Sequence, residues 1–113
     1  MLALLMGLKT ISPEALHKKM KAQPVRVFDL NSPQSWAAAR LPGAVRLEPG
    51  AWGDADLPAT KNAPLVFYCS NPLCRKAPAA AKRAKKLGYT DVAVLAAGIS
   101  GWLADGLPTD SGA

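Results

Sequence analysis

The spacing of apolar and polar residues along this chain alternates between the period typical of β-strands and the period typical of helices. Three apolar runs rich in β-branched or aromatic residues predict strands at residues 25–30, 64–68 and 92–95. The run at 64–68 is apolar throughout, as expected of a central strand that is buried on both faces. A shorter strand is expected at residues 44–47.

Helix signals fall between these strands. Two serine–proline pairs predict helices at residues 13–20 and 33–39, because serine is a good N-cap and proline suits the first turn. Residues 77–87 predict a third helix, which Gly88 ends, and residues 99–105 a short fourth one. Alanines occupy one face of the third helix and cations most of the remainder, so this helix is expected to lie close to a sheet.

The order of these elements predicts the fold class. Strands and helices alternate, with connections long enough for crossovers, which predicts an α/β fold with a central, mostly parallel β-sheet flanked by helices on both faces. Residues 1–113 are expected to form one domain. Within it, residues 48–63 are expected to be a loop with Trp52 against the core. Residues 1–8 are interpreted as a strand, a remnant or the stub of an export signal, and residues 109–113 as a tail.

Composition narrows the functional classes. Half of the residues are apolar and 19% are charged, which is typical of a globular chain. The net charge of +6 would suit nucleic acid, but the densest group of cations, residues 82–86, has no interleaved aromatic residues for base stacking. We therefore expect no nucleic-acid partner, and a positive field that favours small anions. No apolar run is long enough to span a membrane, so a cytoplasmic location is expected, or a periplasmic one if an export signal was removed.

Both cysteines of the chain fall in one loop, directly after the predicted central strand. Two cysteines cannot build a zinc site, and the only histidine, His17, is distant in sequence, so no metal or other cofactor is expected. Cys69 stands where parallel sheets place their ligand sites, beyond the C-terminal end of a strand. The following helix, Arg75 and Lys76 would all lower the pKa of its thiol. Reactive thiols are therefore expected, and the alternative is that Cys69 or Cys74 only packs.

The segment from Tyr68 to Pro108 resembles the second half of a rhodanese-like (sulfurtransferase) domain. Such domains have an aromatic residue before the cysteine, an Ala-Ala helix, a Gly-Tyr cap and a Gly-Ile-x-x-Trp signature. Here these elements are Tyr68-Cys69, Ala80-Ala81, Gly88-Tyr89 and Gly98-Ile99-Ser100-Gly101-Trp102. Residues 11–14, 28–30 and 40–44 are likewise similar to the opening helix, a strand ending in aspartate and the Pro-Gly-Ala turn of the family.

The cysteine loop departs from the common form of that family. It resembles a variant in which four residues separate two cysteines, it has no glycine, and Pro72 removes one N–H donor from an anion cradle. Asn31, Arg40 and Ala97 also replace an arginine, a histidine and a glycine that are common in the family.

The resemblance implies a sulfurtransferase. Cys69 would accept a sulfur atom from a small anionic donor such as thiosulfate, as a persulfide, and pass it to cyanide or to a thiol acceptor, which is a small molecule or a protein. Cys74 would discharge the persulfide or only pack. A monomer or a weak dimer is expected. The residues expected to bind substrate are Ser70, Asn71, Leu73, Arg75 and Lys76.

Two other functions remain open at this level. The two cysteines are close enough in sequence to form a reversible disulfide, which would make the chain a thiol redox or persulfide-handling module. Cys69 and Arg75 also have the Cys-x5-Arg spacing of phosphatases and arsenate reductases, although Tyr68 stands where those phosphatases carry histidine.

Overall fold

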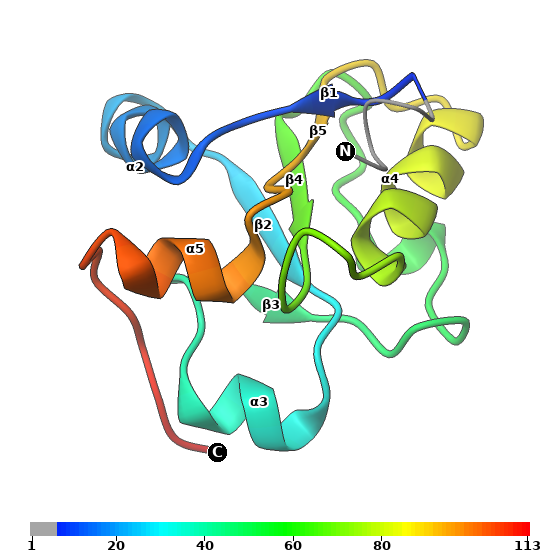
Figure 1. Cartoon of the computed structure of the whole chain (residues 1–113). Helices are drawn as coiled ribbons and strands as arrows, with labels where there is room; N and C mark the ends of the chain where they lie inside the picture. The colour runs from blue at the N-terminus through cyan, green and yellow to red at the C-terminus, as the bar shows by residue number, and fades with distance from the viewer. Residues whose placement is uncertain (1–6) are drawn as a thin grey trace.

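The predicted strands pair into one sheet. The computed structural model describes residues 7–113, and in it five strands pair in parallel in the order β1-β5-β4-β2-β3 (Figure 1). The strands are β1 (Lys9–Thr10), β2 (Arg26–Asp29), β3 (Val45–Arg46), β4 (Leu65–Tyr68) and β5 (Val92–Val94). The α-helices are α2 (Pro13–Ala22), α3 (Pro33–Ala38), α4 (Lys76–Lys86) and α5 (Gly98–Ala104), and a 3-10 turn, η1, spans Asp54–Asp56. The predicted α/β class is confirmed.

The serine caps start the first two helices as predicted. The Ser12 hydroxyl accepts the N–H of Ala15 at 3.1 Å, and the Ser32 hydroxyl accepts the N–H of Ser35 at 3.2 Å. Each bond satisfies a backbone donor that the first helical turn would otherwise leave without a partner.

The sequence pattern does not predict β1. This strand has two residues, which pair with Ala93 and Val94 of β5 at one edge of the sheet. The predicted strand or remnant at residues 1–8 lies largely outside the described residues. No helix in the described part of the chain is long and apolar enough to cross a membrane.

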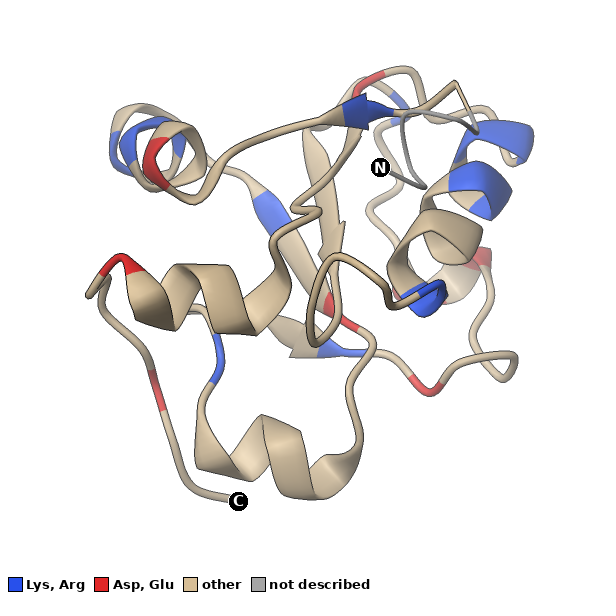
Figure 2. Ribbon diagram, in the orientation of Figure 1, with Lys and Arg blue, Asp and Glu red and all other residues tan. Residues whose placement is uncertain are grey.

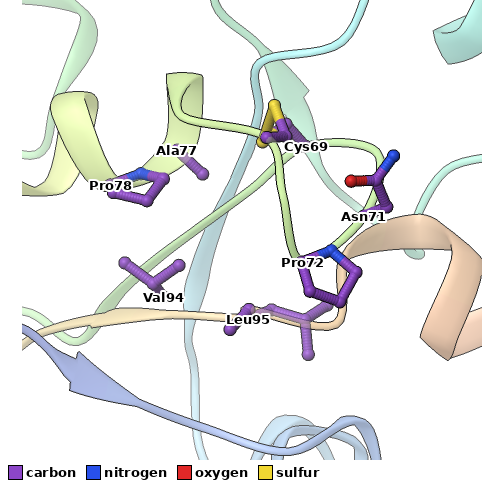
Figure 3. Close-up of a pocket in the computed structure, with 9 residues that line it drawn as sticks. Cys69, Asn71, Pro72, Ala77, Pro78, Val94 and Leu95 are labelled. Atoms are coloured by element: carbon purple, nitrogen blue, oxygen red, sulfur yellow. A yellow bond between two sulfur atoms is a disulfide. The ribbon is translucent and has the colours of Figure 1, made fainter. Parts of the chain in front are cut away.

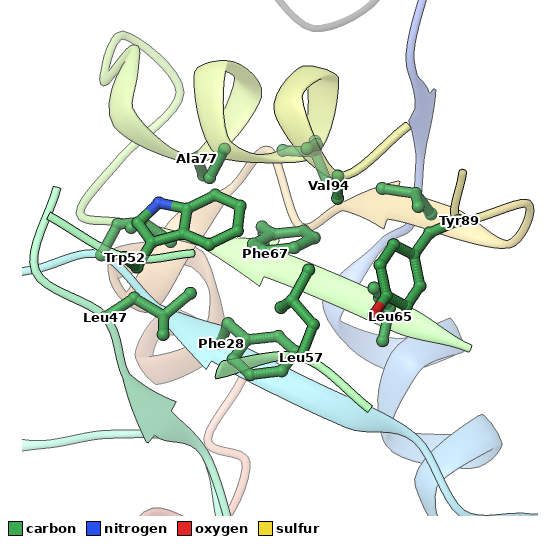
Figure 4. Packing of buried hydrophobic residues seen from close by; sticks show 14 of the residues in the cluster. Phe28, Leu47, Trp52, Leu57, Leu65, Phe67, Ala77, Tyr89 and Val94 are labelled. Carbon is green, nitrogen blue, oxygen red and sulfur yellow. The ribbon is translucent and has the colours of Figure 1, made fainter. Parts of the chain in front are cut away.

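The central strand β4 separates two hydrophobic clusters. Leu65, Phe67 and Cys69 face the cluster under α4, where Trp52 of the long loop also packs, as predicted (Figure 4). Val66 and Tyr68 face the other cluster, to which α2 and α5 contribute. Every residue of β4 is buried, which confirms the central strand inferred from its unbroken apolar run.

A buried polar network ties the ends of β2 and β4 together. The Asp29 carboxylate accepts the Asn31 N–H at 2.7 Å and the Tyr68 hydroxyl proton, and the Tyr68 oxygen accepts the Leu41 N–H at 3.2 Å. Burial raises the pKa of Asp29, against the hydrogen bonds from Tyr68 and Asn31 that lower it. Burial and the neighbouring Asp29 charge also raise the pKa of Tyr68.

The raised pKa of Asp29 predicts a pH-dependent stability. Because the folded chain holds this proton more tightly than the unfolded chain, the associated stability is fully present below the unfolded pKa and is lost as the pH rises through the folded pKa. We expect Asp29→Asn to remove that part of the decline, because the amide does not titrate. Urea unfolding of both proteins across a pH series measures it, and parallel curves would contradict the assignment.

Candidate active site

Cys69 lies directly after β4 and is joined to Cys74 by a disulfide. Cys69 is 3% exposed, and the Cα atoms of Cys69 and Cys74 are 6.4 Å apart, within the range that a disulfide can bridge (Figure 3). Cys74 is half-buried and packs against the cluster under α4. The loop therefore brings both predicted cysteines together, in an oxidised state in which neither is a nucleophile.

The loop between the cysteines is closed by Asn71. The side-chain oxygen of Asn71 accepts the Leu73 N–H at 2.9 Å, and its backbone oxygen accepts the Cys74 N–H at 3.1 Å. Pro72 has no N–H. In this closed loop, two of the donors expected to cradle an anion are thus already bonded within the loop itself.

The first turn of α5 fixes the start of the loop. The Ile99 N–H donates to the Cys69 carbonyl at 2.9 Å, and the Ser100 N–H donates to the Ser70 carbonyl at 3.0 Å. Gly98, with φ of 67°, packs so close that a Cβ there would lie 2.6 Å from the Ser70 carbonyl carbon. The Gly-Ile pair of the sequence signature therefore has a physical role, since it holds the cysteine loop against α5.

A small cavity borders the disulfide. Pro72, Pro78, Val94 and Leu95 surround it together with the two cysteines (Figure 3). Its volume is about 10 Å³, close to the minimum for one water molecule. An anion such as thiosulfate does not fit there while the disulfide is closed.

The predicted binding residues lie around this loop. Ser70 is half-buried and held by α5, and Asn71 forms the turn described above. The Leu73 side chain is 87% exposed at the tip of the loop. Arg75 and Lys76 are exposed at the start of α4, where cations also continue along the helix (Figure 2).

Sequence reasoning missed a second hollow beside the site. Trp52 and Arg83 border it together with Lys76, and the Arg83 guanidinium lies 4.6 Å from the centre of the Trp52 ring. Trp52 was expected only to fill the core, and Arg83 only to face solvent. Lys76 and Arg83 are two helical turns apart in the sequence, and this spacing could have indicated that both lie on one side of α4.

Asn31 contributes a buried amide at the same edge of the sheet. Its side-chain Nδ2 atom has no hydrogen-bond partner among the described residues, whereas its backbone carbonyl accepts the Arg46 Nε–H at 2.8 Å. Continuing the β2–β4 register from Asp29 and Tyr68 places Asn31 level with Ser70. Sequence reasoning noted Asn31 only as a departure from the family pattern. No cluster of His, Cys, Asp or Glu within residues 7–113 could hold a metal ion.

Comparisons with known proteins identify the family and support the fold. The sequence model of a family described as rhodanese-like domain matches residues 12–105. An HTH-type transcriptional regulator of Mycobacterium tuberculosis is 29% identical over 91% of this chain, which spans 45% of that protein. The crystal structure of thiosulfate sulfurtransferase from Pseudomonas aeruginosa superposes with a TM-score of 0.80 and 28% identity, over 93% of this chain and 20% of that one. A Bacillus halodurans protein gives a TM-score of 0.82 at 19% identity, over 96% of this chain and 80% of that one.

The contact between Gly98 and the loop predicts a large effect of a single methyl group. Gly98→Ala combines a strained positive φ with the clash against Ser70, whereas Gly106→Ala has a similar φ of 69° and no atom within 4 Å of the added Cβ. We expect Gly106→Ala to cost about 1 kcal/mol of folding free energy and Gly98→Ala a further ~1–3 kcal/mol. Urea denaturation of the two variants tests this, and equal losses would mean that the close approach has no energetic weight.

Proposed function

We propose that this chain, which belongs to the rhodanese-like domain family, is a sulfurtransferase that carries sulfur as a persulfide on Cys69. The observation that carries the proposal is the position of Cys69, at the C-terminal end of the buried central strand and at the start of the loop that leads into α4. The similarity to a solved thiosulfate sulfurtransferase supports the same chemistry.

The first half-reaction begins from the reduced loop. The Cys69 thiolate attacks the outer sulfur of thiosulfate, the S–S bond of the donor breaks, and sulfite leaves with the electron pair. Cys69 then carries the sulfur as a persulfide anion. No general base is required, because the positive end of α4 and the neighbouring cations favour the thiolate before the donor arrives.

The second half-reaction regenerates the thiolate. Cyanide or a thiolate acceptor attacks the outer persulfide sulfur and leaves as thiocyanate or as a new persulfide. Cys74 offers another exit, in which its thiolate attacks the inner sulfur, expels sulfide and forms the Cys69–Cys74 disulfide. A thiol reductant must then supply two electrons to reopen the loop.

Arg75 and Lys76 would attract the anionic donor. Both are exposed at the start of α4, where a charge adds little to folding but contributes to the field that an approaching anion meets. Ser70, Asn71 and Leu73 would form the rest of the mouth once the disulfide opens.

A thiol redox module is the second candidate. The Cys69–Cys74 disulfide favours it. Oxidation removes the free thiol of Cys69 and holds the loop closed, and a partner protein could distinguish this closed loop from the reduced one. The likeness to part of an HTH-type transcriptional regulator is consistent with a sensing role for a domain of this kind. The phosphatase alternative has less support, since a loop with Pro72 and with the Leu73 and Cys74 N–H groups bonded internally offers few donors to wrap a tetrahedral anion.

Loss of Cys69 tests the sulfurtransferase proposal. We expect Cys69→Ser to lower thiosulfate-to-cyanide sulfur transfer by at least roughly a thousandfold, because no other thiol stands at the end of β4. Cys74→Ser is the matched control, since it removes the same disulfide but keeps the nucleophile. Near-normal turnover by a Cys69→Ser protein with native circular dichroism would overturn the proposal.

Loss of Cys74 tests its role in discharging the persulfide. If Cys74 expels sulfide, the persulfide of Cys74→Ser should decay several-fold more slowly than that of the wild type, and no internal disulfide should form. Cold cyanolysis of protein loaded with thiosulfate measures the decay. Equal decay rates would leave Cys74 with a packing role only.

A further inference from the structure

A hollow of about 180 Å³ lies on the other side of α4's first turns from the cavity at the disulfide. It is far above the ~10–15 Å³ that one water molecule needs. It lies between the end of β2, the loop that follows β3 and the part of α4 from Lys76 to Arg83. Its lining residues are Leu30, Pro49, Gly50, Trp52, Lys76, Ala79, Ala80 and Arg83.

The hollow combines an apolar wall with two cations. Leu30, Trp52 and Ala80 line the hollow and belong to the hydrophobic cluster under α4, so the wall that they form is carbon. Arg83 lies over the Trp52 ring, a contact that orients its guanidinium. Among residues 7–113, neither Lys76 nor Arg83 forms an ion pair, whereas Arg46 and Lys9 have carboxylate partners.

The hollow is also close to the cysteine loop. The β2–β4 register continues from Asp29 and Tyr68 to Leu30 and Cys69, and both of these residues belong to the same buried cluster. Lys76 lies two positions after Cys74 and borders the hollow. A ligand held here can therefore extend toward the loop from the side opposite the small cavity.

We propose that this hollow binds the carboxylate-bearing end of the thiol that accepts sulfur from Cys69, with Arg83 and Trp52 setting the preference. The proposal rests on the proposed sulfurtransferase function. Arg83 and Lys76 bind the carboxylate, and the carbon chain of the acceptor lies on Trp52 and Leu30. The acceptor thiolate attacks the outer persulfide sulfur, the bond to Cys69 breaks, and Cys69 recovers its electron pair as a thiolate.

The composition of the hollow favours the acceptor over the donor. Thiosulfate has no carbon and needs only charge and hydrogen-bond donors, which Arg75 at the loop and Lys76, between the loop and the hollow, supply. An organic thiol with a carboxylate has both an apolar part and an anionic end, and the hollow offers a surface for each. The larger volume of the hollow agrees with the larger ligand.

Acceptor kinetics test the proposal with two thiols of similar size. Mercaptopropionate carries a carboxylate, and mercaptoethanol is neutral. We expect Arg83→Gln to raise the KM for mercaptopropionate roughly tenfold, as for the loss of one charge-assisted hydrogen bond, with kcat nearly unchanged. The KM for mercaptoethanol should not change. Because each thiol is compared only between variants, their different thiol acidities do not enter.

A neighbouring lysine provides the matched control. Lys82→Gln removes the same charge from the same helix, but Lys82 is exposed and does not border the hollow. We expect it to leave both KM values within about twofold of the wild type. An equal effect of Lys82→Gln and Arg83→Gln would attribute the preference to the general field of the helix and overturn the proposal.

A binding measurement separates this proposal from the function on which it rests. Methylthiopropionate keeps the carboxylate but has no thiol, so it binds without reacting. We expect it to shift the indole N–H signal of Trp52 saturably in nuclear magnetic resonance spectra of both wild-type and Cys69→Ser protein, and to bind Arg83→Gln roughly tenfold more weakly. Trp52→Phe identifies the signal. Saturable binding without any sulfur transfer would refute the sulfurtransferase but retain the anion site, whereas sulfur transfer without a Trp52 shift would refute the hollow.

Discussion

Two hydrogen bonds from the first turn of α5 to the carbonyl groups of Cys69 and Ser70 determine where the central strand ends and the cysteine loop begins. Gly98 makes this approach possible, because its missing Cβ leaves room for the Ser70 peptide. The strand itself is buried on both faces, so Cys69 is carried to the edge of the sheet by a rigid element. The chemistry proposed for Cys69 depends on that placement.

The site has two states, one with the Cys69–Cys74 disulfide closed and one with it open. While it is closed, Cys69 has no free thiolate, the adjoining cavity holds no more than about one water molecule, and two loop N–H groups are bonded within the loop. The proposed sulfur transfer would need the open loop, whereas in a redox module the closed loop would be the state that a partner recognises. Both proposals therefore use the same two cysteines and differ in which state has the function.

The fold was largely predictable from sequence because its signals are local. Serine caps, the apolar run of β4 and the alanine face of α4 each lie within a few consecutive residues. The hollow beside the loop was not predictable, because Trp52 and Arg83 are distant in sequence and are brought together only by the tertiary fold. The same holds for the close approach of Gly98 to Ser70 and for the unpartnered amide of Asn31. The strand β1 was missed because two residues carry no periodicity.

In the proposed mechanism, Cys69 accepts sulfur only when the Cys69–Cys74 bond is open. Intact-mass spectrometry of fully reduced and fully oxidised protein, each treated with thiosulfate, tests it most directly. We expect the reduced protein either to gain one sulfur atom, which a thiol reductant removes, or, where Cys74 discharges the persulfide, to lose two hydrogens and release sulfide. The oxidised protein, already lighter by two hydrogens, should gain no sulfur and release no sulfide. A sulfur gain by the oxidised protein, or a reduced protein that neither gains sulfur nor releases sulfide, would contradict this dependence.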